Sequence, residues 1–162
     1  MNLEQAREQI VGSHKFRGAM YYYFFDEMEK ELGNEKAAAI FERATHRRGE
    51  EVHEDYKGFL EKDDFPAAGK HFCDTSPIDG ELFFPKVEAA DASHMVITMR
   101  GCPLVDVWRE MGLSDEKVEL LCKLSCGLDY GNFDTDLTKL SFTGYLGRGD
   151  EECRLVVEKR EK

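Results

Sequence analysis

The stretch 122–133 holds the densest set of groups that could do chemistry. At 100° per residue, Cys122, Cys126 and Asp129 fall on one face of a helix that extends through them. A carboxylate buried beside two thiols would have its pKa raised and could serve as a general acid or base. We therefore take Asp129 and Cys126 as candidate catalytic residues, with the nearby Asn132 as a candidate substrate-binding residue.

Two groups could attack a substrate here, the Cys126 thiol or a water molecule. Cys126 lies near the C-terminal end of the expected helix, where the helix dipole disfavours a thiolate and raises the thiol pKa. Unless a cation such as Arg100 approaches, Cys126 is a poor nucleophile, and a water activated by Asp129 is at least as good a candidate. The alternative interpretation makes the cysteines small core residues and Asp129 a capping or turn residue.

A second candidate group lies on an earlier helix, where His46, Glu50 and His53 are spaced i, i+4 and i+7. Glu50 and His53 also form a Glu-x-x-His unit, which builds di-iron sites in helix bundles. Such a site needs a second Glu-x-x-His unit and a further carboxylate helix, and the later helix over 115–127 offers only acidic residues near its start and no histidine. We favour a solvated helix face with i,i+4 charge pairs and predict no metal, while a metal on this face stays an alternative.

Gly49 lies inside the same expected helix, where a glycine costs roughly 1 kcal/mol relative to alanine. We expect another backbone to approach closely there, a crossing helix more readily than a ligand. The neighbouring Arg48, or Arg100, could bind a small carboxylate through two parallel hydrogen bonds.

The five cysteines are an odd number, and a chain of 162 residues does not need disulfides to be stable. We expect reduced thiols, with Cys102, Cys122 and Cys153 as candidate lining residues of a substrate pocket. A metal site could also be built from Cys102, Cys122, Cys126 and Cys153. Because no Cys-x-x-Cys pair is present, we predict neither a metal nor a cofactor. The sequence also lacks a glycine-rich phosphate loop and a Gly-x-Ser-x-Gly elbow.

Length and charge restrict the classes of partner. The 162 residues suit one domain, and the formal net charge of −11 disfavours nucleic acid and anionic lipid as partners. No apolar run reaches the roughly 18 to 20 residues that a membrane span needs. The N-terminal Met-Asn-Leu-Glu-Gln has neither the basic nor the apolar segment of a signal peptide. We therefore predict a cytoplasmic protein that acts on a small molecule.

Helical periodicity dominates the first part of the chain, residues 1–62, which we expect to form a helical hairpin. A short first helix is followed by a helix over 13–32 and another over 34–62, joined by a tight turn. This hairpin could also mediate a homodimer. Proline and glycine then punctuate a stretch from residue 63 that has no helical period.

The second part, residues 82–162, shows the period-two alternation of strands. We predict four strands, at 82–88, 94–100, 140–146 and 153–157. Two helices lie between the second and third strands, one opening at Cys102-Pro103 and the other capped by Ser114. The predicted fold class is therefore α+β, with the N-terminal helical hairpin packed on a small antiparallel sheet of about four strands that contains two inserted helices.

Several of these segments resemble the L-2-amino-thiazoline-4-carboxylic acid hydrolase family. Its C-terminal signature reads Cys-x-x-Asp, a Phe-Asn-Pro-like segment, then Gly-Asp-x-x-Cys before a final strand. The corresponding segments here are Cys126-Gly127-Leu128-Asp129, Asn132-Phe133-Asp134-Thr135-Asp136-Leu137 and Gly149-Asp150-Glu151-Glu152-Cys153. The opening Arg100-Gly101-Cys102-Pro103 with Trp108, and the hairpin from Tyr23 to Gly49, are also similar. The departure is Asp134-Thr135, where Asn-Pro is usual, and it bears on the loop.

The resemblance implies hydrolytic opening of a small cyclic amidine that bears a carboxylate, giving a carbamoyl-cysteine. The expected activity is thus that of a metal-independent hydrolase acting on a C–N bond of a thiazoline carboxylate. It further implies Asp129 as acid/base or amidine anchor, with Cys126 beside it and Cys153 in the hairpin motif. The alternatives are a non-catalytic sensor domain that binds a small ligand, and a metal or redox module. By architecture alone, the expected fold is similar to ligand-binding four-vinyl-reductase and TRAPP-subunit domains.

Overall fold

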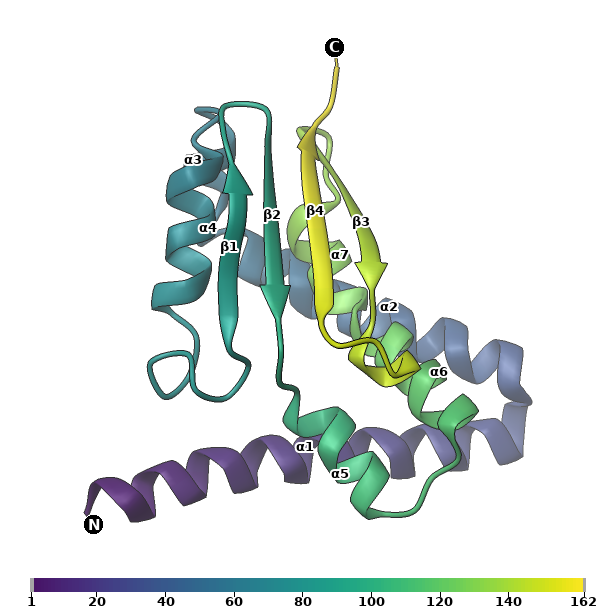
Figure 1. Cartoon of the computed structure of the whole chain (residues 1–162). Helices are drawn as coiled ribbons and strands as arrows, with labels where there is room; N and C mark the ends of the chain where they lie inside the picture. Colours follow the sequence, from purple (N-terminus) through teal and green to yellow (C-terminus); the bar gives the residue numbers. More distant parts are fainter. Residues whose placement is uncertain (1, 162) are drawn as a thin grey trace.

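The computed structural model describes residues 2–161 and begins with one long helix, α1 (Leu3–Leu32), along an edge of the molecule (Figure 1). Asn2 caps this helix with a reciprocal capping box. The expected break near Ser13 is wrong, and the short first helix and its successor are continuous. The Ser13 hydroxyl donates a hydrogen bond to the Ile10 carbonyl inside the helix, so it does not cap a new one.

The second arm of the hairpin is α2 (Asn34–His53), which follows α1 after Gly33. Gly33 has a φ of 80°, a conformation that glycine adopts without strain. The predicted hairpin is therefore present, but its second helix ends at His53, earlier than expected. A turn and the single-turn helix α3 (Lys57–Leu60) replace the remainder.

A helix that the sequence pattern did not predict, α4 (Phe65–Asp74), follows in the proline- and glycine-punctuated stretch. The Asp64 carboxylate accepts a hydrogen bond from a backbone N–H of its first turn, and Pro66 stands in that turn. Gly69 lies in the middle of α4. A Cβ added there would lie 3.0 Å from the Val87 side chain, so the glycine lets α4 pack closely on the sheet.

The sheet has four antiparallel strands, as predicted, and their order is β1-β2-β4-β3 (Figure 1). The strands are β1 (Pro85–Ala90), β2 (His94–Met99), β3 (Thr138–Gly144) and β4 (Cys153–Lys159). On the central strands Met95 lies opposite Val157 and Ile97 opposite Leu155, and all four side chains are fully buried. This sheet face packs on α4 and α7.

Three helices separate β2 from β3: α5 (Pro103–Glu110), α6 (Asp115–Ser125) and α7 (Gly127–Phe133). Ser114 caps α6 as expected. The helix predicted to follow it breaks at Cys126, which ends α6, so α7 is a separate helix. The overall class is α+β, in agreement with the prediction.

Two hydrophobic clusters form the interior. One gathers α1, α2, α5 and α6 around Phe25 and Trp108, and the other joins the sheet to α3, α4 and α7 around Phe65 and Phe133. The Trp108 indole N–H donates a 2.7 Å hydrogen bond to the Gly18 carbonyl and so fixes α5 on α1. The positions of the helices around the site follow from these contacts.

The surface of α1 carries most of the large apolar side chains that are exposed in the described chain. They are Leu3, Ile10, Phe16, Tyr23, Phe24 and Leu32. Within residues 2–161, no helix combines the length and the apolar character that crossing a bilayer would require. The homodimer and the cytoplasmic location stay predictions.

Candidate functional site

A cavity of about 310 Å³ lies between the two hydrophobic clusters. Much of its wall is apolar, with Tyr56, Phe142 and Met99 from the sheet side and Leu104 and Trp108 from the helical side. A volume near 300 Å³ is at the lower end of the range for small-molecule sites, so the cavity suits a small ligand.

Asp129, in the first turn of α7, lines this cavity and is half-buried. Its carboxylate makes no hydrogen bond or ion pair with any residue from 2 to 161, and burial alone raises its pKa to about 7. Because no cation compensates its charge, the carboxylate is close to half-ionised at neutral pH. An unpartnered acceptor of this kind can bind an N–H donor or take up a proton.

Four thiols line the same cavity, those of Cys102, Cys122, Cys126 and Cys153. A hydrogen bond from Cys122 lowers the pKa of Cys126, but burial and the nearby charge of Asp129 outweigh it, and the pKa is raised. The pKa of Cys122 is raised to about 12, first by its hydrogen bond to Cys126, and burial raises that of Cys102 to about 11. The pKa of Cys153 is also raised, by its hydrogen bond to Cys122 and by burial. All four are therefore neutral thiols near pH 7.

The position of Asp129 is set by the crossing of α7 over α2. A Cβ added to Gly49 would collide with the Leu128 carbonyl, and one added to Gly131 would collide with the His46 carbonyl. The close backbone approach predicted at Gly49 is thus confirmed, and its cause is a crossing helix. Since glycines let the two backbones touch, α7 has little freedom to rotate and Asp129 is held toward the cavity.

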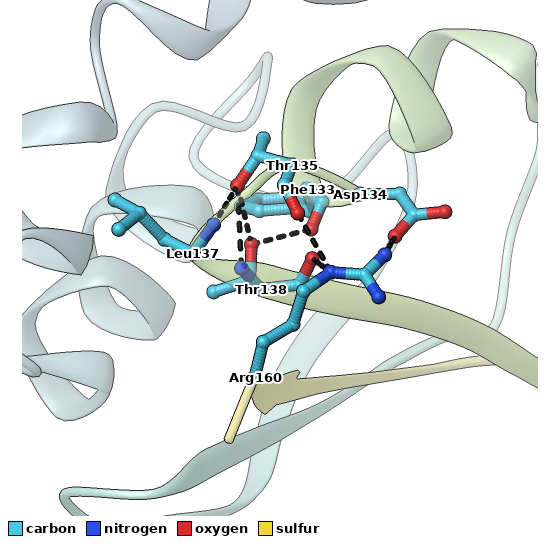
Figure 2. Close-up of polar contacts among 6 residues, drawn as sticks. All are labelled: Phe133, Asp134, Thr135, Leu137, Thr138 and Arg160. Carbon is cyan, nitrogen blue, oxygen red and sulfur yellow. Dashed lines mark hydrogen bonds and ion pairs between the residues drawn. The ribbon is translucent and has the colours of Figure 1, made fainter. Parts of the chain in front are cut away.

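The loop after α7 is anchored by Arg160, beyond the end of β4 (Figure 2). Its guanidinium donates to the carbonyls of Thr135 (2.7 Å) and Thr138 (3.0 Å) and pairs with Asp134 at 2.6 Å. The Thr138 hydroxyl donates to the Phe133 carbonyl at 2.6 Å, which satisfies the C-terminal end of α7. The Asp134-Thr135 segment therefore ties the helix that carries Asp129 to the sheet.

Asn132 is not part of the cavity wall. It is 2% exposed, does not line the cavity, and its Oδ1 atom has no hydrogen-bond partner among residues 2–161. Its carbonyl oxygen lies 2.6 Å from His53 Nδ1, so the two residues join α2 to α7.

His46 and Glu50, the other members of the candidate metal face on α2, form a surface pair. His46 Nδ1 lies 3.5 Å from a carboxylate oxygen of Glu50, the i,i+4 pairing that was favoured for this face. In the described part of the chain, no three His, Cys, Asp or Glu side chains are grouped so as to hold a metal ion.

Neither arginine expected to bind a carboxylate lines the cavity. Arg48 is exposed and pairs with Glu51 at 2.9 Å, and Arg100 is exposed and lies 3.3 Å from Glu152. Each guanidinium is paired at the surface with a nearby glutamate.

Sequence reasoning missed several polar residues that line the cavity, among them His14 and Arg17 of α1, Ser125 of α6, and Thr75 and Ser76 at the end of α4. The Ser125 hydroxyl oxygen is buried and has no hydrogen-bond partner within residues 2–161. The available signal was weak, since His14 and Arg17 are one turn apart but nothing in the sequence says which face of α1 meets the cavity.

The protein is an α+β domain whose cavity brings the Asp129 carboxylate together with four thiols. A family model, L-2-amino-thiazoline-4-carboxylic acid hydrolase, matches residues 13–157. The chain belongs to this family. Among curated proteins, none matches the chain significantly.

Two solved structures share the fold. One is the phenol-responsive sensory domain of the transcription activator PoxR with phenol, with a TM-score of 0.56, 16% identity, and coverage of 90% of this chain and 74% of that one. The other is a trafficking protein particle complex subunit 3 from Naegleria fowleri, covalently bound to palmitic acid. Its TM-score is 0.58 at 14% identity, over 92% of this chain and 96% of that one. At these identities the likeness concerns the fold alone.

Proposed function

We propose that this protein hydrolyses a small cyclic amidine that bears a carboxylate, of the 2-amino-thiazoline-4-carboxylate type, with Asp129 as the general base. The observation that carries the proposal is the unpartnered carboxylate of Asp129 in an otherwise largely apolar cavity. Membership of the family supports the reaction class. The cavity volume of about 310 Å³ supports a substrate of this size.

The chemistry follows from the amidine group. Its carbon is bonded to two nitrogens and, in a thiazoline, to the ring sulfur. A water adds across the C=N bond while Asp129 takes one of its protons, and collapse of the tetrahedral carbon breaks the C–S bond. One proton of the added water ends on the ring nitrogen and the other on the sulfur, which yields a carbamoyl group and a free thiol. Water thus attacks the carbon of the C=N bond, which is the C–N unit expected from the sequence. The ring opens when the C–S bond breaks.

Each group of the site has a defined part in this proposal. A base whose pKa is close to the working pH combines a useful ionised fraction with useful proton affinity, and Asp129 meets this condition. The N–H groups of the amidine satisfy its otherwise unpartnered oxygens. The Cys126 thiol is protonated near pH 7, so we give it no nucleophilic role and treat it as a neutral wall of the site beside the carboxylate.

The test is turnover of L-2-amino-thiazoline-4-carboxylate by the purified protein, followed by mass spectrometry as the gain of one water. We expect kcat/KM to rise with pH through about 7 as Asp129 ionises. Asp129→Asn should lower kcat by roughly 10²- to 10⁴-fold, the usual contribution of a general base. Retained turnover in this variant would remove Asp129 from the reaction.

A second candidate function is a non-catalytic sensor domain. It is favoured by the apolar wall of the cavity and by the fold shared with a phenol-responsive sensory domain. Under this alternative, phenol or a similar small aromatic compound raises the unfolding temperature in proportion to its binding, and no product forms. Stabilisation by phenol together with no turnover of the thiazoline would favour the sensor.

A further inference from the structure

The cavity has a cationic side that belongs to α1. His14 and Arg17 are one helical turn apart and both line it, and Tyr21 continues the same face one turn later. Arg17 is exposed and His14 is half-buried, so these two side chains stand where the cavity meets solvent. We call His14 and Arg17 the α1 rim.

The α1 rim is held in place by the packing of α1 on α5. A Cβ added to Gly18 would come within 2.7 Å of the Val107 side chain, and the Gly18 carbonyl accepts the 2.7 Å hydrogen bond of Trp108. Gly18 directly follows Arg17, so this contact fixes where the arginine side chain leaves the helix. The His14 ring packs edge-on against Phe83 at 5.8 Å, and its Nδ1 lies 2.9 Å from the Ile10 carbonyl.

The Arg17 guanidinium carries a charge that the described chain does not neutralise. Arg17 forms no ion pair with any residue from 2 to 161, although the protein has 33 acidic and only 22 basic residues. By contrast, Arg48 and Arg100 are each paired with a glutamate. A guanidinium that is free of carboxylates can offer two parallel N–H donors to an anionic ligand.

The two charged sides of the cavity are separate. Arg17 and Asp129 form no ion pair with each other among residues 2–161. One cavity therefore presents an unpartnered acceptor inside and an unpartnered cation at its mouth. A ligand that satisfies both has N–H donors at one end and an anionic group at the other.

We infer that the α1 rim is an anion-binding subsite that selects ring substrates bearing a carboxylate, with Arg17 as the main contact and His14 as its neighbour. This inference rests on the proposed function, since it assigns the other end of the same substrate. It moves the expected carboxylate clamp from Arg48 or Arg100 to Arg17. Because Arg17 is exposed, its contribution should be screened by salt.

The experiment compares two matched substrates, L-2-amino-thiazoline-4-carboxylate and 2-amino-2-thiazoline, which lacks the carboxylate. For each compound, kcat and KM are measured for the parent protein, Arg17→Gln, and the control Arg43→Gln, an exposed arginine of α2 that does not line the cavity. We expect the parent to prefer the carboxylated ring. Arg17→Gln should reduce this preference, the ratio of the two kcat/KM values, about 10- to 100-fold and mainly through KM, as for a lost charged hydrogen bond.

His14→Gln should reduce the preference less than Arg17→Gln does, and high salt should reduce it only in proteins that keep Arg17. An unchanged preference in Arg17→Gln, with normal turnover, would overturn the anion subsite while leaving the proposed hydrolase intact. If the parent binds both compounds without turning them over, the preference is measured instead from the shifts in unfolding temperature that the two compounds cause. The proposed hydrolase activity then fails, while the anion subsite is still tested. If neither compound binds the parent, both proposals fail.

Discussion

Gly49 of α2 and Gly131 of α7 pack backbone against backbone, so that a Cβ added to Gly49 would lie 2.8 Å from the Cα of Gly131. This crossing orients α7, and α7 carries Asp129. A second glycine of α7, Gly127, approaches α2 in the same way, where an added Cβ would meet the Thr45 hydroxyl and the Glu42 carbonyl. The geometry of the site thus depends on glycines that have no chemistry of their own.

The first prediction concerns this crossing. Gly131→Ala should lower the free energy of unfolding by about 3 kcal/mol, because its Cβ would meet the fixed His46 carbonyl and the helices must separate. The matched control is Gly12→Ala in α1, where nothing lies within 4 Å, and which should stabilise the helix by up to about 1 kcal/mol. Urea unfolding of the three proteins measures both changes. Equal stabilities for Gly131→Ala and the parent would contradict the crossing.

The second prediction is a pH dependence of stability that comes from Asp129. Its pKa is 3.8 in the unfolded chain and about 7 in the folded protein, so between these values the unfolded chain has lost a proton that the folded protein keeps. The burial of Asp129 therefore lowers the free energy of unfolding as pH rises from about 4 to 7, and the full cost remains above pH 7.

Asp129→Asn removes this cost, so the variant should gain stability relative to the parent as pH rises. The gain between pH 4 and pH 8 should reach up to roughly 4 kcal/mol, from a shift of about three pKa units. Thermal or urea unfolding of both proteins across this range gives the difference. A difference that does not vary with pH would mean that the carboxylate is not buried as the structure has it.

The third prediction separates the thiol from the carboxylate. Because its pKa is raised, the Cys126 thiol is scarcely ionised near pH 7, and Cys126→Ala should keep turnover within about tenfold of the parent. Asp129→Asn should lose far more. The measurement is steady-state kinetics on the thiazoline, together with mass spectrometry of the protein during turnover. A covalent adduct on Cys126 during turnover, or the loss of all activity in Cys126→Ala, would instead identify Cys126 as a nucleophile.

The fourth prediction concerns the Ser125 hydroxyl, which is buried at the cavity without a partner in the described chain. An unpaired buried hydroxyl costs stability, so Ser125→Ala should raise the free energy of unfolding by about 1 kcal/mol. The control is Thr45→Val, which removes a hydroxyl that donates to the Leu124 carbonyl at 2.9 Å and should cost about 1 kcal/mol. If Ser125→Ala also weakens binding of the thiazoline, the hydroxyl is a ligand contact. A loss of stability in Ser125→Ala would show that the hydroxyl is satisfied in the protein.

The sequence was sufficient wherever neighbours along the chain decide the structure. Ser114 predicted the start of α6, and alternation predicted β2 and β4, because caps and strand faces are local properties. The spacing of Cys122, Cys126 and Asp129 likewise predicted that they share a side, and all three line the cavity despite the break between α6 and α7. The helix α4 was not predicted because Pro66 and Gly69 interrupt this stretch of the sequence, whereas in the structure Pro66 lies in the first turn of α4 and Gly69 is a packing contact.

The tertiary structure alone decided which distant residues complete the site. His14 and Arg17 reach the same cavity as Asp129 because Gly18 lets α1 pack against α5, a contact between segments far apart in the chain. Asn132 was expected at the site from its proximity in sequence, but it is buried outside the cavity where α7 crosses α2, and its backbone carbonyl contacts His53. Residue spacing determines which side chains share a face of an element, whereas packing between elements determines what that face meets.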